Sequence, residues 1–173
     1  MPNELTHSPD PTARCAPAAP STSTGSGAAP EDATTRLVVR PWWDPDLAVR
    51  GHDPRGAYAE RFWLGVIGPS TLFLLRRLAR GFETHPGGFA VDVAETARAL
   101  GLGAGTGRNA PLTRSLDRAC AFGLARRRPD GSVEVRTHLP PLARRQVARL
   151  PASVRRALEE WPPQGAPAAP GTA

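Results

Sequence analysis

The stretch PLTRSLDRACAFGLARRRPDGSVEVR, residues 111–136, decides the fold. In its first half, apolar residues recur at the spacing of one helix face: Leu112, Leu116, Ala119 and Cys120. The period then changes to two, and Pro129-Asp130-Gly131 separates two strand-like runs, which is typical of a β-hairpin. The stretch therefore predicts a helix over 111–122 that leads directly into a hairpin over 124–138.

Helical periodicity also predicts most of the surrounding elements. Apolar residues recur at helical spacing in five further segments: 58–67, 69–82, 92–100, 142–150 and 152–161. Pro69 suits the first turn of the second of these, and Asp92 is a good N-cap for the third. We expect an irregular or short extended arm over 36–57 and loops over 83–90 and 101–110. The fold class is then mainly α with a small β-hairpin (α+β).

The two ends of the chain differ in composition from its middle. Residues 1–35 and 162–173 are rich in Pro, Ala, Ser, Thr and Gly and hold almost nothing that could be buried. Segments that bury no apolar surface cannot offset the conformational entropy that is lost on ordering. We therefore expect two disordered tails, the first of them acidic, around one folded unit at 36–161.

The positive charge is concentrated in one part of the sequence. All 22 basic residues are arginine, and the formal net charge is +6. A GC-rich genome favours Arg over Lys through codon choice, so the residue type says nothing about phosphate binding. Codon choice does not cluster charge, however, and residues 108–156 hold 12 arginines against three acids. This clustering indicates a nucleic-acid-binding surface in the last third of the chain.

The order of the expected elements resembles a known DNA-binding architecture. VDVAETARALGLG (91–103) is similar to the first helix of a helix-turn-helix, and 111–136 is similar to a recognition helix with its wing. AFGLARRRPDGSVEV resembles the wings of bacterial winged-helix regulators, while ERFWLGVIGPSTLFLLRRLA and RLPASVRRAL resemble uncharacterised winged-helix proteins of high-GC actinobacteria. The resemblance implies a winged-helix core over 69–138 with extra N- and C-terminal helices, and it implies no particular activity.

From this arrangement we predict a DNA-binding protein that resembles a transcriptional regulator. A helix of this length fits the major groove of double-stranded DNA, and basic residues beside it contact phosphates. Arg114 and Arg118 are four residues apart and therefore share a helix face. The predicted contact residues lie on the helix, on the loop before it and on the wing: Arg108, Thr113, Arg114, Arg118, Arg126, Arg127, Arg128 and Arg136.

Two alternatives remain open at this point. In one, Arg114 pairs with Asp117 on a solvated helix surface, and the wing arginines only keep the hairpin soluble. In the other, the chain is a winged-helix interaction module that holds a protein partner without binding DNA directly. Trp42 and Trp43 are then either an anchor for that partner or a cover for the core.

No pattern in the sequence indicates catalysis or a cofactor. The glycine-rich stretch 101–107 follows a predicted helix and not a strand, so it indicates a flexible loop and no dinucleotide site. Cys120 lies on the apolar helix side and is expected to be a small core residue. The four histidines lack metal-ligand spacing, and no apolar run reaches the ~20 residues of a membrane span. We expect a cytoplasmic, non-enzymatic homodimer with no cofactor, metal or small-molecule ligand.

Overall fold

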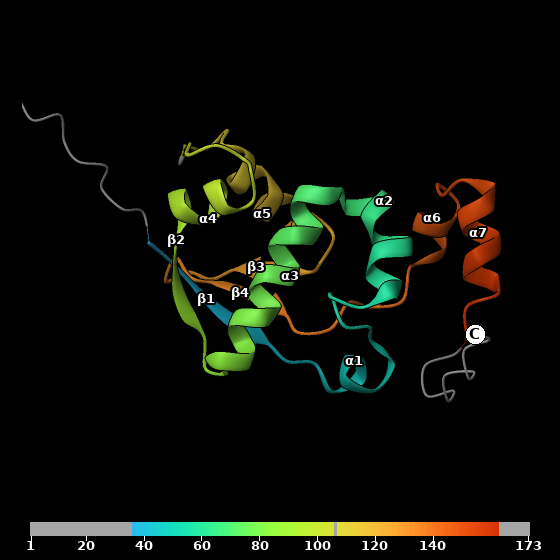
Figure 1. Ribbon diagram of the computed structural model, residues 1–173. Coiled ribbons are helices and arrows are strands. Elements are labelled where there is room, and N and C mark those ends of the chain that lie inside the picture. The colour runs from blue at the N-terminus through green and yellow to red at the C-terminus, as the bar shows by residue number, and fades with distance from the viewer. Residues whose placement is uncertain (1–35, 106, 163–173) are drawn as a thin grey trace, which may run out of the picture. The chain divides into compact units, whose positions relative to one another are not determined.

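The computed structural model describes residues 36–105 and 107–162. They form an α+β fold in which helices pack on one four-stranded sheet (Figure 1). The expected α+β class is therefore confirmed, although the sheet has four strands where the sequence predicts only a hairpin. The tails that the sequence predicts at 1–35 and 162–173 lie outside the described residues, apart from Pro162.

The helices follow the helical periods of the sequence. Their bounds are α1 Pro45–Arg50, the π-helical η1 Ala59–Trp63, α2 Leu64–Ile67, α3 Pro69–Thr84, α4 Val93–Ala99, α5 Pro111–Ala121, α6 Arg144–Val147 and α7 Ala152–Glu159. The Asp92 carboxylate caps α4, as expected, by accepting a hydrogen bond from the Glu95 N–H at 2.9 Å. Of the helix expected over 142–150, only the short α6 forms. Within the described ranges, no helix combines the length and the apolar character that a membrane crossing requires.

The sheet has the strand order β2-β1-β4-β3. The bounds of its strands are β1 Arg36–Trp42, β2 Phe89–Asp92, β3 Ala125–Arg127 and β4 Val133–Arg136. β1 runs antiparallel to β2 and parallel to β4, with Val39 opposite both Phe89 and Val133. β3 and β4 form the antiparallel hairpin that Pro129-Asp130-Gly131 predicts. Gly131 has a φ of 79°, which suits glycine in a tight turn.

Two segments differ from the prediction. The arm expected over 36–57 contains an inner strand of the sheet, β1, followed by α1. The loop expected over 83–90 ends in β2, which forms an edge of the same sheet. Both strands are short, and their partners lie far away along the chain, so no local period reveals the pairing.

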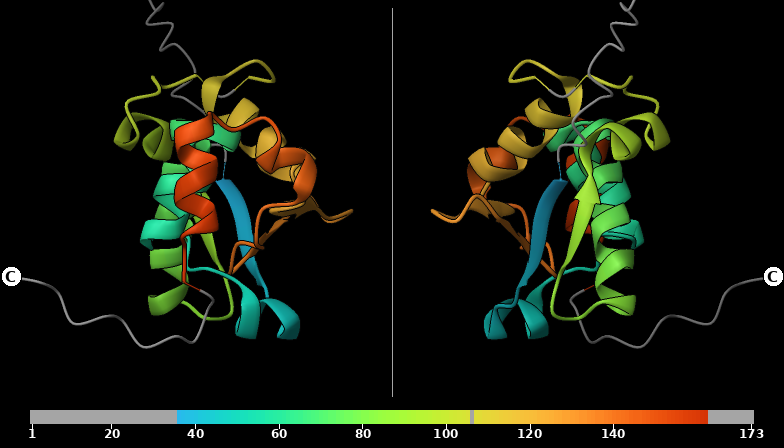
Figure 2. Two further views of the ribbon diagram at one scale, coloured as in Figure 1. Left: turned by 90° about the vertical axis from the view of Figure 1, so that its right-hand side faces the viewer. Right: turned by 90° about the vertical axis from the view of Figure 1, so that its left-hand side faces the viewer.

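The core lies between one face of the sheet and the helices. The sheet contributes Val39, Ala125, Val133 and Val135, and the helices contribute larger buried side chains: Phe62, Trp63, Ile67, Leu72, Leu75, Leu78, Leu112 and Leu116. α3 lies along β1 on this face (Figure 2). The Trp63 indole N–H donates to the Pro140 carbonyl at 3.0 Å, which fixes the chain after β4 to η1. The Trp161 ring packs edge-on against Phe62, so the segment after α7 also joins the core.

The packing of β1 against the helices can be tested on two neighbouring residues. We expect Val39→Ala to lower the free energy of unfolding by about 2 kcal/mol, because it removes buried methyl groups and leaves a cavity. Val38→Ala is the control, since this side chain is 42% exposed while that of Val39 is 0% exposed. It should cost less than about 1 kcal/mol in urea unfolding. Equal effects would contradict the burial of Val39 against the helices.

Candidate nucleic-acid interface

α5 presents one polar side because its other side is fixed in the core. Leu112, Leu116 and Ala119 are buried where α5 packs on α3, α4 and β3. The buried Ser115 hydroxyl donates to the Pro111 carbonyl at 2.9 Å and so leaves no polar group unsatisfied on this side. The exposed side chains of the helix are Arg114, Asp117, Arg118 and Ala121. The inward apolar stripe predicted for this helix is therefore confirmed.

The arginines of α5 have few internal partners. The Arg118 guanidinium donates to the Val66 carbonyl at 3.0 Å and lies 5.7 Å from the centre of the Phe122 ring. Arg114 is exposed, and no hydrogen bond or ion pair engages its side chain in residues 36–105 and 107–162. The Thr113 hydroxyl donates to the Gly107 carbonyl at 3.1 Å, which fixes the loop before α5 to the helix. Arg108, also exposed, lies on that loop.

One hairpin arginine joins this surface. Arg127 lies opposite Val133 in the β3–β4 register, so its side chain points to the same side of the sheet as the core. Its guanidinium forms an ion pair with Asp117 of α5 at 2.8 Å. Asp117 thus pairs with Arg127 of the hairpin, whereas the sequence analysis considered a pair between Asp117 and Arg114. We call the set Arg108, Thr113, Arg114, Asp117, Arg118 and Arg127 the α5 surface.

The neighbouring hairpin arginines point the other way. Arg126 lies opposite Glu134 in the register, and their side chains form an ion pair on the sheet face away from the core. Arg128 approaches the same carboxylate at 3.5 Å. Alternation along the chain therefore separates Arg126 and Arg128 from the α5 surface, although Arg126, Arg127 and Arg128 are consecutive.

Arg136 is held inside a cluster around Trp42, whose ring also lies 4.2 Å from the Arg126 guanidinium. The Arg136 guanidinium stacks over the Trp42 ring at 3.8 Å, bonds to the Asp44 carboxylate and donates to the Gly123 carbonyl at 2.8 Å. Its side chain is only 18% exposed. The hydrogen bond from Arg136 holds the pKa of the Asp44 carboxyl below its ordinary value of 3.8. These contacts join the end of β1, the start of α1 and the end of β4.

The eight residues predicted from the sequence therefore fall into two groups. Those of the first group lie on the α5 surface: Arg108, Thr113, Arg114, Arg118 and Arg127. Those of the second group lie on the opposite face of the sheet and its turn: Arg126, Arg128 and Arg136. Sequence reasoning missed the partners Trp42 and Asp44, because the segment that carries them was expected to be an arm.

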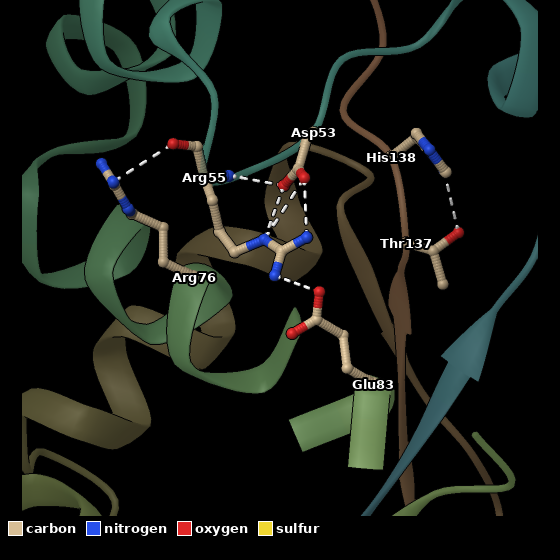
Figure 3. Close-up of polar contacts among 6 residues, drawn as sticks. All are labelled: Asp53, Arg55, Arg76, Glu83, Thr137 and His138. Carbon is tan, nitrogen blue, oxygen red and sulfur yellow. Dashed lines mark hydrogen bonds and ion pairs between the residues drawn. The ribbon is translucent and has the colours of Figure 1, made fainter. Parts of the chain in front are cut away.

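A second polar cluster lies where residues 51–57 meet α3 and the end of β4 (Figure 3). Arg55 forms ion pairs with Asp53, at 2.8 Å, and with Glu83, while Arg76 donates to the Arg55 carbonyl at 3.2 Å. The hydrogen bonds from Arg55 lower the pKa of the Asp53 carboxyl. A hollow of about 210 Å³ adjoins the cluster, with His138 at its border. Since both carboxylates are bound to one arginine, the cluster is suited to fixing residues 51–57 to α3.

The remaining chemical groups are placed as follows. The Cys120 thiol is half-buried against the core, and burial raises its pKa, which agrees with its expected role as a small core residue. The glycine-rich loop follows α4, a helix, and not a strand. Among the described residues, no group of three His, Cys, Asp or Glu side chains is arranged to hold a metal ion.

The Arg136 cluster predicts a pH-dependent contribution to stability. The pKa of Asp44 is lowered in the folded state. The ionised carboxylate therefore stabilises the fold at pH values above the ordinary carboxyl pKa of 3.8, and this stabilisation is lost as the pH falls below that value. We expect Asp44→Asn to lower Tm by about 5 °C at neutral pH, since asparagine keeps the α1 cap but loses the ion pair. The difference in Tm between the native chain and this variant should become smaller below pH 4.

Asp46→Asn is the matched control, because Asp46 is exposed and, within the described residues, its one ion pair is with Arg50, at 3.6 Å. It should change Tm little. Thermal unfolding followed by circular dichroism between about pH 3 and pH 7 measures both variants. A deficit for Asp44→Asn that stays constant over this range would contradict the role assigned to the ion pair.

Comparison with protein-family models, with curated protein sequences and with solved structures gave no match. The function must therefore be inferred from the side chains and their geometry. The α5 surface is the feature that these contacts leave exposed and basic, while the arginines of the other group are largely engaged by Glu134 and Asp44.

Proposed function

We propose that this chain is a DNA-binding protein of the winged-helix type, similar to a transcriptional regulator, in which α5 reads the duplex and the β3–β4 hairpin is the wing. The order α3, β2, α4, α5, β3, β4 supports the proposal, because it is the order of elements in such folds. The observation that carries it is the α5 surface, where Arg114 and Arg118 project together from a helix whose other side is buried.

Each residue of the α5 surface has a proposed role. α5 is 11 residues long, which suits the width of the major groove. Thr113 contacts a base edge, while Arg108, Arg114, Arg118 and Arg127 contact phosphates on either side of the groove. Arg126 and Arg128 keep nearly half of their side chains exposed, but they pair with Glu134 on the sheet face away from α5 and lie outside the proposed contact surface. Arg136 serves the fold, since its side chain is only 18% exposed and bonds to Asp44 and Gly123.

Trp43 and Val49 offer a place for a protein contact. Their side chains are 64% and 76% exposed, and both lie at or near α1. In the DNA-binding proposal their partner is a second copy of this chain, so that two α5 helices read two half-sites on cytoplasmic DNA. The same exposed residues favour the second candidate function, a winged-helix module that holds a different protein and does not bind DNA.

The ion pair between Asp117 and Arg127 provides a sharp test of DNA binding. Asp117→Asn removes the acid from the α5 surface and releases Arg127, so the affinity for a mixed-sequence duplex should rise roughly threefold or more. Arg127→Gln should weaken binding and reduce the slope of log K against log salt by about 0.9, since one phosphate contact is lost. Fluorescence anisotropy of a labelled duplex between about 50 and 200 mM NaCl measures both effects.

The controls are Asp46→Asn and Arg50→Gln, which break a similar exposed pair on α1. α1 lies at the other end of the described unit from α5 (Figures 1 and 2), so neither change should alter affinity. Two results would replace the proposal with the protein-binding candidate. One is the absence of duplex binding at low salt, and the other is an Asp117→Asn variant that binds no better than the native chain.

A further inference from the structure

A hollow of about 360 Å³ opens beside the α5 surface, between α5 and the junction of α2 with α3. Two arginines of α5, Arg114 and Arg118, line one side of it, and the first residues of α3 line the other. None of its described lining residues is acidic. The hollow is therefore positively charged on one side, with no carboxylate to neutralise that charge.

The α3 side of the hollow presents unused hydrogen-bond donors. α3 is 16 residues long, and its N-cap is Gly68, which supplies no side chain to cap the helix. Pro69 has no N–H, and no acceptor among the described residues takes the N–H groups of Ser70 or Thr71. Both residues line the hollow. The N-terminus of a helix attracts anions, because free N–H groups and the positive end of the helix dipole point outward there.

The Thr71 side chain adds a second, independent donor. The residue is only 2% exposed, yet no hydrogen bond of its hydroxyl is present in the described part of the chain. Every fully enclosed side-chain nitrogen or oxygen of the described residues has a partner. The hydroxyl of Thr71 is therefore not enclosed, and it is reached from the hollow that this residue lines. A hydroxyl that opens onto the hollow and has no partner among the described residues is free to donate to a ligand there.

The two arginines complete a cradle for an anion. Arg118 is partly fixed by its bond to the Val66 carbonyl, at the end of α2, which keeps its guanidinium beside the start of α3. Arg114, one helical turn earlier, has its donors available in the described structure. Two guanidinium groups, two backbone N–H groups and one hydroxyl suit the oxygens of a phosphate group, which accepts several hydrogen bonds at once.

We propose that the hollow between α3 and α5 is a phosphate-binding site formed by the Ser70 and Thr71 N–H groups, the Thr71 hydroxyl, Arg114 and Arg118. The site itself does not require DNA binding; only the source of its phosphate rests on the proposed function. A backbone phosphate of the duplex read by α5 is one source, and the phosphate of a small molecule is the other. The recognising chemistry is the same for both.

The first experiment uses inorganic phosphate and the full chain. In an NMR titration at constant ionic strength, with chloride as the balancing anion, the amide signals of Ser70 and Thr71 should shift and saturate. Thr71→Val keeps the side-chain shape but removes the hydroxyl, and it should weaken phosphate binding roughly fivefold or more. Arg118→Gln should weaken it by a similar factor. The matched controls are Thr84→Val and Arg77→Gln, on exposed positions of α3 outside the hollow, and they should leave binding unchanged.

The second experiment identifies the source. A mixed-sequence duplex is added to the phosphate-saturated protein, and displacement of the phosphate from the Ser70 and Thr71 amides is the result expected for a backbone phosphate. Saturation by phosphate without displacement by a bound duplex would overturn that source and assign the site to a small molecule. If phosphate saturates the site and the chain binds no duplex, the proposed function fails while the site stands. Duplex binding without any saturable phosphate shift would overturn the site and leave the proposed function intact.

Discussion

The sheet depends on the parallel pairing of β1 with β4, its two inner strands. Without this pairing β2 would be separated from the β3–β4 hairpin, and the helices would have no continuous face to cover. The pairing buries Val39 against Val133 on the core side. On the other side it brings Trp42 beside Arg136, where the guanidinium stacks on the indole and bonds to Asp44. One register therefore fixes both faces of the sheet.

The register of β3 with β4 determines which arginines are available to a ligand. Val133 and Val135 face the helices, so Glu134 and Arg136 face away from them. Arg126 lies opposite Glu134 in the register and points to the same side of the sheet. Arg127 alone of the hairpin arginines turns towards α5, where it meets Asp117. Four arginines then lie on or beside one helix: Arg108, Arg114, Arg118 and Arg127. A compact basic surface next to a helix N-terminus binds phosphates in general, and its position on an exposed helix suits a duplex.

Local patterns in the sequence were sufficient for α3, α4, α5, α7 and the hairpin, but not for α1 or for the short extent of α6. Pro69, Asp92 and the Pro129-Asp130-Gly131 turn each act within a few residues, so their effects can be predicted without tertiary contacts. β1 and β2 could not be predicted in this way, because each is stabilised by strands that are distant in sequence. The site was predictable in part. The face of α5 follows from its period, whereas the separation of Arg126 from Arg127 depends on their partners, Glu134 on β4 and Asp117 on α5.

The central claim is that a duplex binds at α5 and not at the opposite face of the sheet. An NMR titration of the full chain with a mixed-sequence duplex at low salt tests this claim directly. The account predicts that the largest amide shifts fall on residues 111–121, on the start of α3 and on Arg127. It predicts little change at the Trp42 indole N–H, which belongs to the Arg136 cluster. Large shifts at Trp42 with none on α5, or no shifts at all, would contradict it.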